Sequence, residues 1–397
     1  MDMKQTLLIA QKLGDYALNC NYAGYDPYDM LNSPLSGILS LGTRWGRIAM
    51  TQFGRRSPVN LRPLFLIKRG VNPKAVALFL EGYAKLHKFA PDEVYKERMR
   101  SLAGLLDSLR SPGVSGAAWG YNFPWQNRIQ CLKRYTPTIV NSAFAGHALL
   151  DYYELTGEQR ALDMAMSIPD FMLNDLNRKQ EGDSFCFSYT PCDQNFVHNA
   201  NMLGASLMAR LGKVYGRTEL LDPALQALSY SMRHQHDDGS WFYAETRAQS
   251  WIDSFHTGFN LEALKRFIEL GLTPEYAENY QRGVDFYANN FFLEDGTAKY
   301  FHDRLYLVDI HAPAEALTFF SAAGSEYRVL VEKVGNWTLK NMYNAKSGLF
   351  YFRKAKYFTI RTPYLRWSEA WAFRAMTSCA TAGGKKLSAE ILSAGLL

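Results

Sequence analysis

Cysteine is scarce in this sequence, and its five cysteines include no C-x-x-C pair. An odd number without paired spacing argues against a disulfide framework and against a structural zinc site. We therefore expect a reduced, cytoplasmic protein.

Long apolar runs are missing as well. Runs such as 78–80 and 291–293 are far shorter than the roughly 20 residues that span a bilayer, so no transmembrane segment is expected. The first 20 residues have a helical rhythm and a four-residue apolar run, which predicts a helix rather than a signal peptide.

Several ligand signatures are absent. The sequence contains no Walker A loop and no Rossmann glycine pattern, so no nucleotide cofactor is expected. No two histidines have the close spacing of H-E-x-x-H, which argues against a metal site, although the histidines described below are of a type that zinc and iron accept. The net charge of +6 is small and scattered, which excludes a nucleic-acid-binding face.

A repeated pattern is present instead. Hydrophobic residues make up 47% of the chain, enough for a large core. A segment rich in glycine and aromatics recurs, each time followed by a polar loop and a helix opening. These segments are 115–125, 182–189, 238–245, 295–302 and 347–354. In the third, Trp241 and Tyr243 alternate with Phe242 as in a strand.

The helix openings align on Asn141, His198, His256, His311 and Trp367, at intervals of 57, 58, 55 and 56 residues. This period fits two helices and a long loop, and such helix pairs can close into a ring. We therefore predict an all-α (α/α)6 toroid with short β-hairpin segments in its loops. The expected layout is one domain, with N-terminal hairpins in 1–110, five units in 115–379 and a tail helix in 385–397.

A motif adds a resemblance. Residues 235–241 (QHDDGSW) are similar to the Q-x-x-D-G-x-W motif of α/α-toroid proteins, and the period resembles that of six-hairpin glycosidases, polysaccharide lyases and sugar epimerases. The segments 24–29, 238–243 and 255–264 also resemble toroid proteins from bacterial exopolysaccharide and lipopolysaccharide gene clusters. The resemblance implies a carbohydrate substrate, a role in surface polysaccharide metabolism and association with polysaccharide biosynthesis proteins.

The aligned openings carry polar residues where a purely structural repeat would favour small or apolar ones. We predict that His198, His256 and His311 converge on one cavity, near Asp253 and Asp309. The positive end of a helix keeps a histidine neutral and available as a base. The alternative is that these residues only cap their helices.

Two kinds of chemistry fit these residues, and the sequence does not choose between them. Glycoside hydrolysis needs two carboxylates, which Asp253 could form with Asp309, Glu315 or Glu369. A lyase or epimerase needs a base beside a uronic carboxylate and a group that neutralises it. His256 or His198 could serve as that base, with Asn141, Asn260 and Arg361 as partners. Asp253 and His256 are the first candidates for proton transfer, followed by His198, His311, Asp309 and Glu315.

Aromatic side chains beside these positions could stack on sugar rings, or could only fill gaps between helices. They are Trp119, Tyr189, Trp241, Tyr243 and Trp367. Asp29, in the polar loop 21–34, is a further candidate for substrate binding, with turn formation as the alternative. A basic cluster in 353–361 could attract an anionic substrate.

Two rival functions remain. Terpene cyclisation lacks its D-x-D-D motif, since Asp237 and Asp238 lie inside a turn. A non-catalytic toroid that binds polysaccharide or partner proteins would not need carboxylates on its rim. The sequence therefore favours a carbohydrate-active enzyme acting on an oligo- or polysaccharide, with anionic sugars among the candidates.

Overall fold

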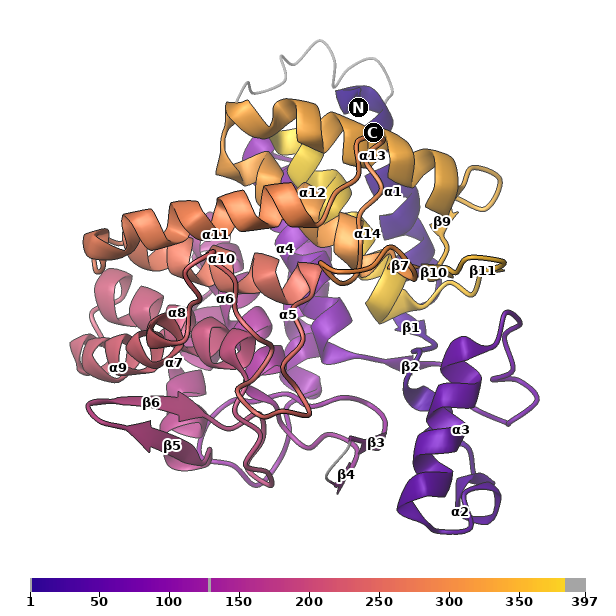
Figure 1. Cartoon of the computed structure of the whole chain (residues 1–397), viewed down its shortest axis with the longest axis horizontal. Coiled ribbons are helices and arrows are strands. Elements are labelled where there is room, and N and C mark those ends of the chain that lie inside the picture. The colour runs from indigo at the N-terminus through magenta and orange to yellow at the C-terminus, as the bar shows by residue number, and fades with distance from the viewer. Residues whose placement is uncertain (1, 128–129, 383–397) are drawn as a thin grey trace.

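The computed structural model describes residues 2–127 and 130–382, so the expected tail helix 385–397 lies outside the described residues. Within them, six helices form a closed inner ring in which each packs on the next and the last packs on the first (Figure 1). They are α4 (Pro73–Phe89), α6 (Ile139–Thr156), α8 (His198–Val214), α10 (Ser254–Glu269), α12 (His311–Ala323) and α14 (Ala370–Thr381).

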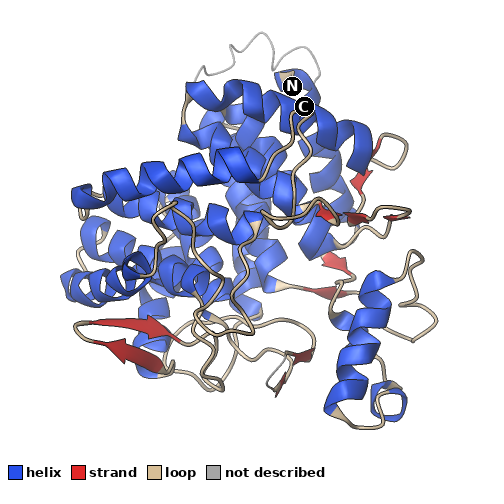
Figure 2. Cartoon of the chain, viewed as in Figure 1, coloured by secondary structure: helices blue, strands red, loops and turns tan. Residues whose placement is uncertain are grey.

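A second layer of helices packs around this ring (Figure 2). It contains α1 (Met3–Asn19), α5 (Glu93–Ser108), α7 (Gln159–Asn174), α9 (Leu221–Arg233), α11 (Ala277–Asn290) and α13 (Arg328–Met342). Five of these pack on the inner helix that precedes them in the chain, whereas α1 packs on α14. The predicted (α/α)6 toroid is confirmed, and its two end helices form one of the pairs.

The helix openings follow simple signals in the sequence. Pro73 is the first residue of α4, where its missing N–H costs nothing, and Asn72 caps that helix by accepting from the Lys74 amide at 3.0 Å. The inner helix α6 is apolar around most of its circumference because neighbours cover it on all sides. The outer helix α9 is amphipathic and buries one face.

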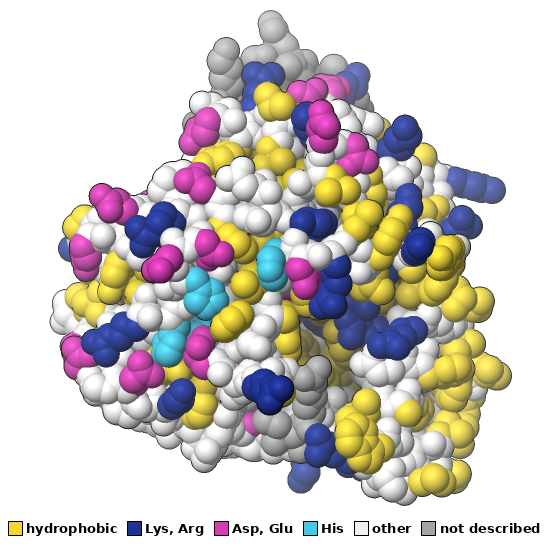
Figure 3. Space-filling model, in the orientation of Figure 1, with side chains coloured by type: hydrophobic (Ala, Val, Ile, Leu, Met, Phe, Trp, Pro, Cys, Tyr) yellow, Lys and Arg dark blue, Asp and Glu magenta, His cyan; other side chains and the backbone are white. Residues whose placement is uncertain are grey.

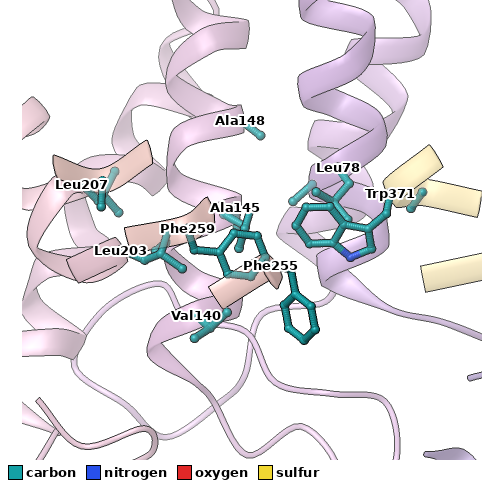
Figure 4. Packing of buried hydrophobic residues seen from close by; sticks show 14 of the residues in the cluster. Leu78, Val140, Ala145, Ala148, Leu203, Leu207, Phe255, Phe259 and Trp371 are labelled. Carbon is teal, nitrogen blue, oxygen red and sulfur yellow. The ribbon is translucent and has the colours of Figure 1, made fainter. Parts of the chain in front are cut away.

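The inside of the ring is filled rather than open. Phe255, Phe259 and Trp371 lie between the inner helices (Figure 4). Together with Phe144 they form an aromatic layer, with Phe144 5.5 Å and Phe259 5.3 Å from Trp371 by ring centroids. Below it, Arg374 of α14 binds carboxylates from three other inner helices. They are Glu81, Glu262 and Glu315. Access is therefore confined to the end where the inner helices begin.

The strands are short, as predicted, and lie in the loops. The pairs are β1 (Ala23–Gly24) with β2 (Gly70–Val71), β3 (Trp125–Gln126) with β4 (Cys131–Leu132), β5 (Arg178–Glu181) with β6 (Ser184–Phe187), and β8 (Tyr343–Asn344) with β9 (Leu349–Phe350). The strand β10 (Arg353–Lys354) lies between β7 (Val308–Asp309) and β11 (Thr359–Ile360). The expected strand at Trp241–Tyr243 does not form, because the chain there turns at Gly239 (φ 90°) and continues as coil.

Residues 21–69 form an insertion between α1 and α4 that projects at the lower right of Figure 1. It contains α2 (Ser36–Leu39) and α3 (Arg44–Arg56). The pairing of β1 with β2 closes its base. Gly42, with φ 62°, separates the two helices.

Candidate functional site

The mouth of the ring is lined by aromatic side chains from separate loops. The hydroxyls of Tyr121 and Tyr189 lie 3.0 Å apart, and Tyr243 stacks on Trp251 with ring centroids 4.6 Å apart. Burial raises the pKa of all three tyrosines, so their hydroxyls stay protonated and can donate hydrogen bonds. Such rings with polar edges suit a sugar.

Asp253 and His256, here called the dyad, stand at the start of α10. Asp253 caps the helix by accepting from the His256 backbone N–H at 3.1 Å. Its Oδ2 lies 2.7 Å from His256 Nδ1 and 2.9 Å from Trp251 Nε1. A carboxylate accepts, so Nδ1 carries the proton and Nε2 is left as the basic nitrogen. No contact with another described residue occupies that Nε2.

The dyad lines a narrow recess together with residues of α8, α10 and the preceding loop. The others are Asn199, Trp241, Phe242, Tyr243, Thr257 and Asn260. Asp253 is the sole carboxylate among these lining residues. Five of the candidates therefore share the recess, namely Asp253, His256, Asn260, Trp241 and Tyr243.

Unpartnered polar atoms occur in the first two turns of four consecutive inner helices. They are both amide atoms of Asn141 on α6, Oδ1 of Asn199 on α8, Oδ1 of Asn260 on α10 and both ring nitrogens of His311 on α12. All four side chains are buried. Buried polar atoms are nearly always hydrogen-bonded, so this row identifies where a polar ligand would satisfy them.

His311 is enclosed by aromatic rings. Phe255 stacks on it at 4.3 Å, and the Trp371 and Trp367 rings lie at 4.2 and 4.7 Å. Burial, reinforced by the Lys74 cation, holds the pKa of His311 well below its usual value. The imidazole is therefore neutral at physiological pH, with one donor and one acceptor.

Lys74 lies next to this histidine and was missed by the sequence analysis. Its Nζ is 4.5 Å from the Phe144 centroid and 5.1 Å from that of Trp371. Burial lowers its pKa well below the usual value. One signal was available, since Lys74 occupies the first turn of α4, where the helix dipole disfavours a cation.

Two buried ion pairs border the mouth. Arg366 donates to Asp26 from Nε at 2.5 Å and from Nη2 at 2.8 Å. Arg353 pairs with Asp309, whose other oxygen accepts from Trp367 Nε1 at 2.7 Å and from the His311 amide at 3.0 Å. Both oxygens of Asp309 are therefore occupied. Asp309 therefore holds Arg353, Trp367 and the start of α12 in position, and it does not face the recess as a free acid.

The predicted convergence of three histidines fails for His198. Its Nε2 lies 2.8 Å from Glu245 and its Nδ1 3.2 Å from Ser231 of the outer helix α9. The ring turns to the outer layer because its partners lie there. His256 lines the recess and His311 is not among its lining residues, although each ring centroid lies 4.3 Å from that of Phe255.

Three carboxyl candidates lie away from the recess. Glu315, one turn deeper than His311, binds Arg374 Nη1 at 3.0 Å, and Glu369 accepts from the Phe350 amide at 3.1 Å. Burial raises the pKa of both. Asp29 is buried against Arg62 Nε at 2.8 Å, and burial raises its pKa to about 6. These carboxyls hold the fold around the site.

The remaining candidates fall into two groups, those that pack inside the fold and those that lie nearer the surface or the mouth. The indole N–H of Trp119 donates to Leu106 at 2.7 Å, and that of Trp241 to Ser231 at 2.9 Å, so both tryptophans close the end of the preceding outer helix. Trp367 lies at the mouth against Tyr28, with centroids 5.4 Å apart. Arg361 is exposed, over the ring of Tyr351.

Residues 69–267, half of the chain, match the family model described as β-L-arabinofuranosidase, GH127 catalytic domain. The chain belongs to this family. The matched residues of this GH127-family chain include Lys74, Asn141, Asp253 and His256. A search of curated proteins gives no match.

Solved structures share the ring. A sugar epimerase from a ruminal bacterium has a TM-score of 0.60 at 13% identity, over 79% of this chain and 88% of its own. Cellobiose 2-epimerase from Bacillus thermoamylovorans has 0.57 at 14%, over 77% and 87%. The GH76 α-mannanase from Bacteroides thetaiotaomicron has 0.59 at 12%, over 81% and 88%. These similarities show the fold, and the GH127 family makes the chain a carbohydrate-active, glycosidase-like domain.

Neither a metal site nor a membrane span is found in the described part of this GH127-family chain. No three histidine, cysteine, aspartate or glutamate side chains gather there as metal ligands. No described helix combines the length and the apolar character needed to cross a bilayer.

Proposed function

We propose that the chain is an enzyme that moves a proton at a sugar carbon, as epimerases and isomerases do. The observation that carries the proposal is the dyad, in which Asp253 fixes His256 with Nε2 directed to a recess rimmed by unpaired amides. A histidine oriented by a carboxylate is a general base near neutral pH. The recess supplies no second carboxylate, as paired-carboxylate hydrolysis would need.

The chemistry follows from this arrangement. His256 Nε2 takes the proton from the carbon beside a carbonyl or uronic carboxylate, and the C–H electron pair forms a C=C bond while the carbonyl oxygen becomes an oxyanion. Protonated tyrosine hydroxyls and Lys74 can stabilise that oxyanion. Asp253 stabilises the imidazolium. The His256 imidazolium then returns the proton, either to the neighbouring carbon, which isomerises the sugar, or to the opposite face of the same carbon, which inverts it.

We further propose an anionic substrate, such as a uronate-containing glycan. Buried nitrogens of two arginines near Tyr300 are unpartnered, Arg55 Nε and Arg353 Nη2. Both guanidinium groups act to lower the pKa of Tyr300, which burial raises. Figure 3 shows Lys and Arg side chains around the hollow between the insertion and the body of the ring. Two cations with free donors suit a carboxylate.

The context we propose is bacterial surface polysaccharide metabolism, with polysaccharide biosynthesis proteins as partners. It rests on the resemblance of segments 24–29, 238–243 and 255–264 to proteins of such gene clusters. Deletion of the gene should change the surface glycan of the producing cell. An unchanged glycan profile would contradict this part of the proposal.

The test is mass spectrometry of uronate-containing and neutral oligosaccharides incubated with the protein in D₂O. Uptake of one deuterium at carbon without cleavage supports the proposal. Cleavage with gain of water supports the second candidate, glycoside hydrolysis, which the GH127 family match favours. Cleavage without gain of water, which leaves one unsaturated fragment, would indicate a lyase. If no sugar changes in mass, the proposal of proton-transfer catalysis is wrong.

A further inference from the structure

The insertion carries an exposed apolar surface. Of the 19 large apolar side chains that are exposed among the described residues, nine lie between residues 35 and 66. Six of the nine are 61–83% exposed, and they are Ile38, Leu41, Trp45, Val59, Leu64 and Leu66. Figure 3 shows apolar side chains gathered over this side of the molecule. Concentrated exposure of this kind marks an interaction surface.

The same segment has charge of a single sign. No Asp or Glu occurs between Asp29 and Glu81, while residues 30–69 contain seven Lys and Arg, more than the net charge of +6 of the whole chain. One of the seven, Arg62, is neutralised by Asp29 inside the insertion. The remaining six cations lie in the same segment as the exposed apolar side chains.

Two of the exposed leucines lie at turns, in a backbone conformation that is unfavourable for leucine. Leu41 and Leu66 both have left-handed backbones, with φ of 51° and 55°, where glycine or asparagine is preferred. Both side chains are exposed, so packing within the chain does not explain them. Their leucine identity serves a contact outside the described fold.

We propose that residues 30–69 dock the toroid onto an anionic lipid surface. Apolar and tryptophan side chains entering the headgroup region, with Arg and Lys around them, are the features of interfacial binding elements. A second copy of this chain is a poor occupant, because two acid-free basic faces repel each other. The insertion is fixed beside the mouth by the Arg366–Asp26 pair, so docking holds the mouth near the headgroups. Docking does not depend on which reaction the site performs.

Flotation with lipid vesicles tests the proposal. We expect the full chain to float with vesicles of phosphatidylcholine and phosphatidylglycerol at least about tenfold better than with phosphatidylcholine alone, and to lose binding as salt rises. Leu41→Asn combined with Trp45→Ser should abolish flotation while circular dichroism stays unchanged. Arg56→Glu with Lys68→Glu should remove the preference for anionic lipid.

Matched controls lie elsewhere on the surface. Val329→Ser, at an apolar side chain with comparable exposure on α13, and Lys346→Glu should both float like the unaltered chain. Absence of flotation in the unaltered chain would overturn the proposal, as would equal flotation of the insertion variants. A dimer in sedimentation that Trp45→Ser dissociates, without lipid binding, would assign the surface to a second copy instead. Retention on an acidic protein partner but not on vesicles would likewise refute it.

Discussion

At the scale of single residues, the site is defined by the hydrogen-bond partners of its polar atoms. Asp253 uses both oxygens and thereby leaves His256 with one basic nitrogen. Asp309, in the next unit, uses both oxygens on an arginine, an indole and an amide, and leaves no free base. Carboxylates at the openings of neighbouring units therefore have different roles, because their partners differ.

Replacing Asp253 by Asn isolates the charge of the dyad. Asparagine caps a helix as well as aspartate, so we expect the melting temperature to change little. Activity should fall by about 10²–10⁴, because the amide no longer fixes the tautomer or stabilises imidazolium. The measurement is kcat/KM on whichever sugar the deuterium screen identifies.

The control for this change is Asp92→Asn, the same replacement at the cap of the outer helix α5, whose side chain accepts from the Val94 amide at 2.8 Å. That variant should keep full activity. Full activity in Asp253→Asn would remove the dyad from the mechanism.

The buried His311 predicts a dependence of stability on pH. Its pKa in the folded chain lies well below the 6.5 of an exposed histidine, so the unfolded chain binds a proton first as the pH falls. The stability contributed by neutral His311 should be fully present above about pH 6.5. Below that pH, the free energy of unfolding should decrease by up to about 1.4 kcal/mol per pH unit.

His311→Phe should remove this contribution, because phenylalanine fits the aromatic surroundings and does not titrate. The measurement is urea unfolding of the two chains between about pH 5 and pH 8, a range that brackets the ordinary pKa of histidine. Buried His147, hydrogen-bonded to Ser206 on another inner helix, remains in both. Parallel pH curves would contradict the expectation.

At the scale of elements, the sequence repeat located the helix openings, and the structure confirms them from α6 to α14. The repeat could not show the direction in which each side chain turns. His198 opens α8 as predicted, but Ser231 and Glu245 draw its ring to the outer layer. Lys74 precedes the five aligned units, so no repeat position pointed to it. The packing of Phe144, Phe259 and Trp371 around it depends on ring closure, which the local sequence does not encode.

The tryptophans that follow the outer helices allow a prediction about how helices and loops pack on each other. Trp119 donates its indole N–H to the Leu106 carbonyl in the last turn of α5, and phenylalanine would keep most of the packing but lose this hydrogen bond, while the carbonyl still accepts from the Leu109 amide. We expect Trp119→Phe to cost about 0.5–1.5 kcal/mol in urea unfolding. Sugar turnover should be unchanged, since Trp119 is fully buried. A loss of turnover without a loss of stability would give Trp119 the substrate role that the sequence suggested.

At the scale of the whole molecule, one arginine connects four of the six inner helices. Arg374 of α14 binds Glu81 of α4, Glu262 of α10 and Glu315 of α12. Burial raises the pKa of Glu315, so its protonation leaves fewer charges to balance. Arg374 is thus a central tie below the aromatic layer.

Arg374→Met should destabilise the chain by about 3–5 kcal/mol, because it leaves buried carboxylates without a cation. Arg210→Met is the matched control, since Arg210 also binds two carboxylates but nearer the surface, and its loss should cost about 1 kcal/mol or less. Equal losses in thermal or urea unfolding would show that Arg374 has no special part in ring closure.

The Arg366–Asp26 pair joins residues 340 positions apart. On a ribosome, Asp26 is translated 340 positions before its partner, so it is made long before the pair can form. Contacts of such long range form late and slowly. A product that terminates before Arg366 therefore lacks this closure of the mouth however well its first hairpins fold, and the proposed sugar turnover would report that synthesis had passed this residue.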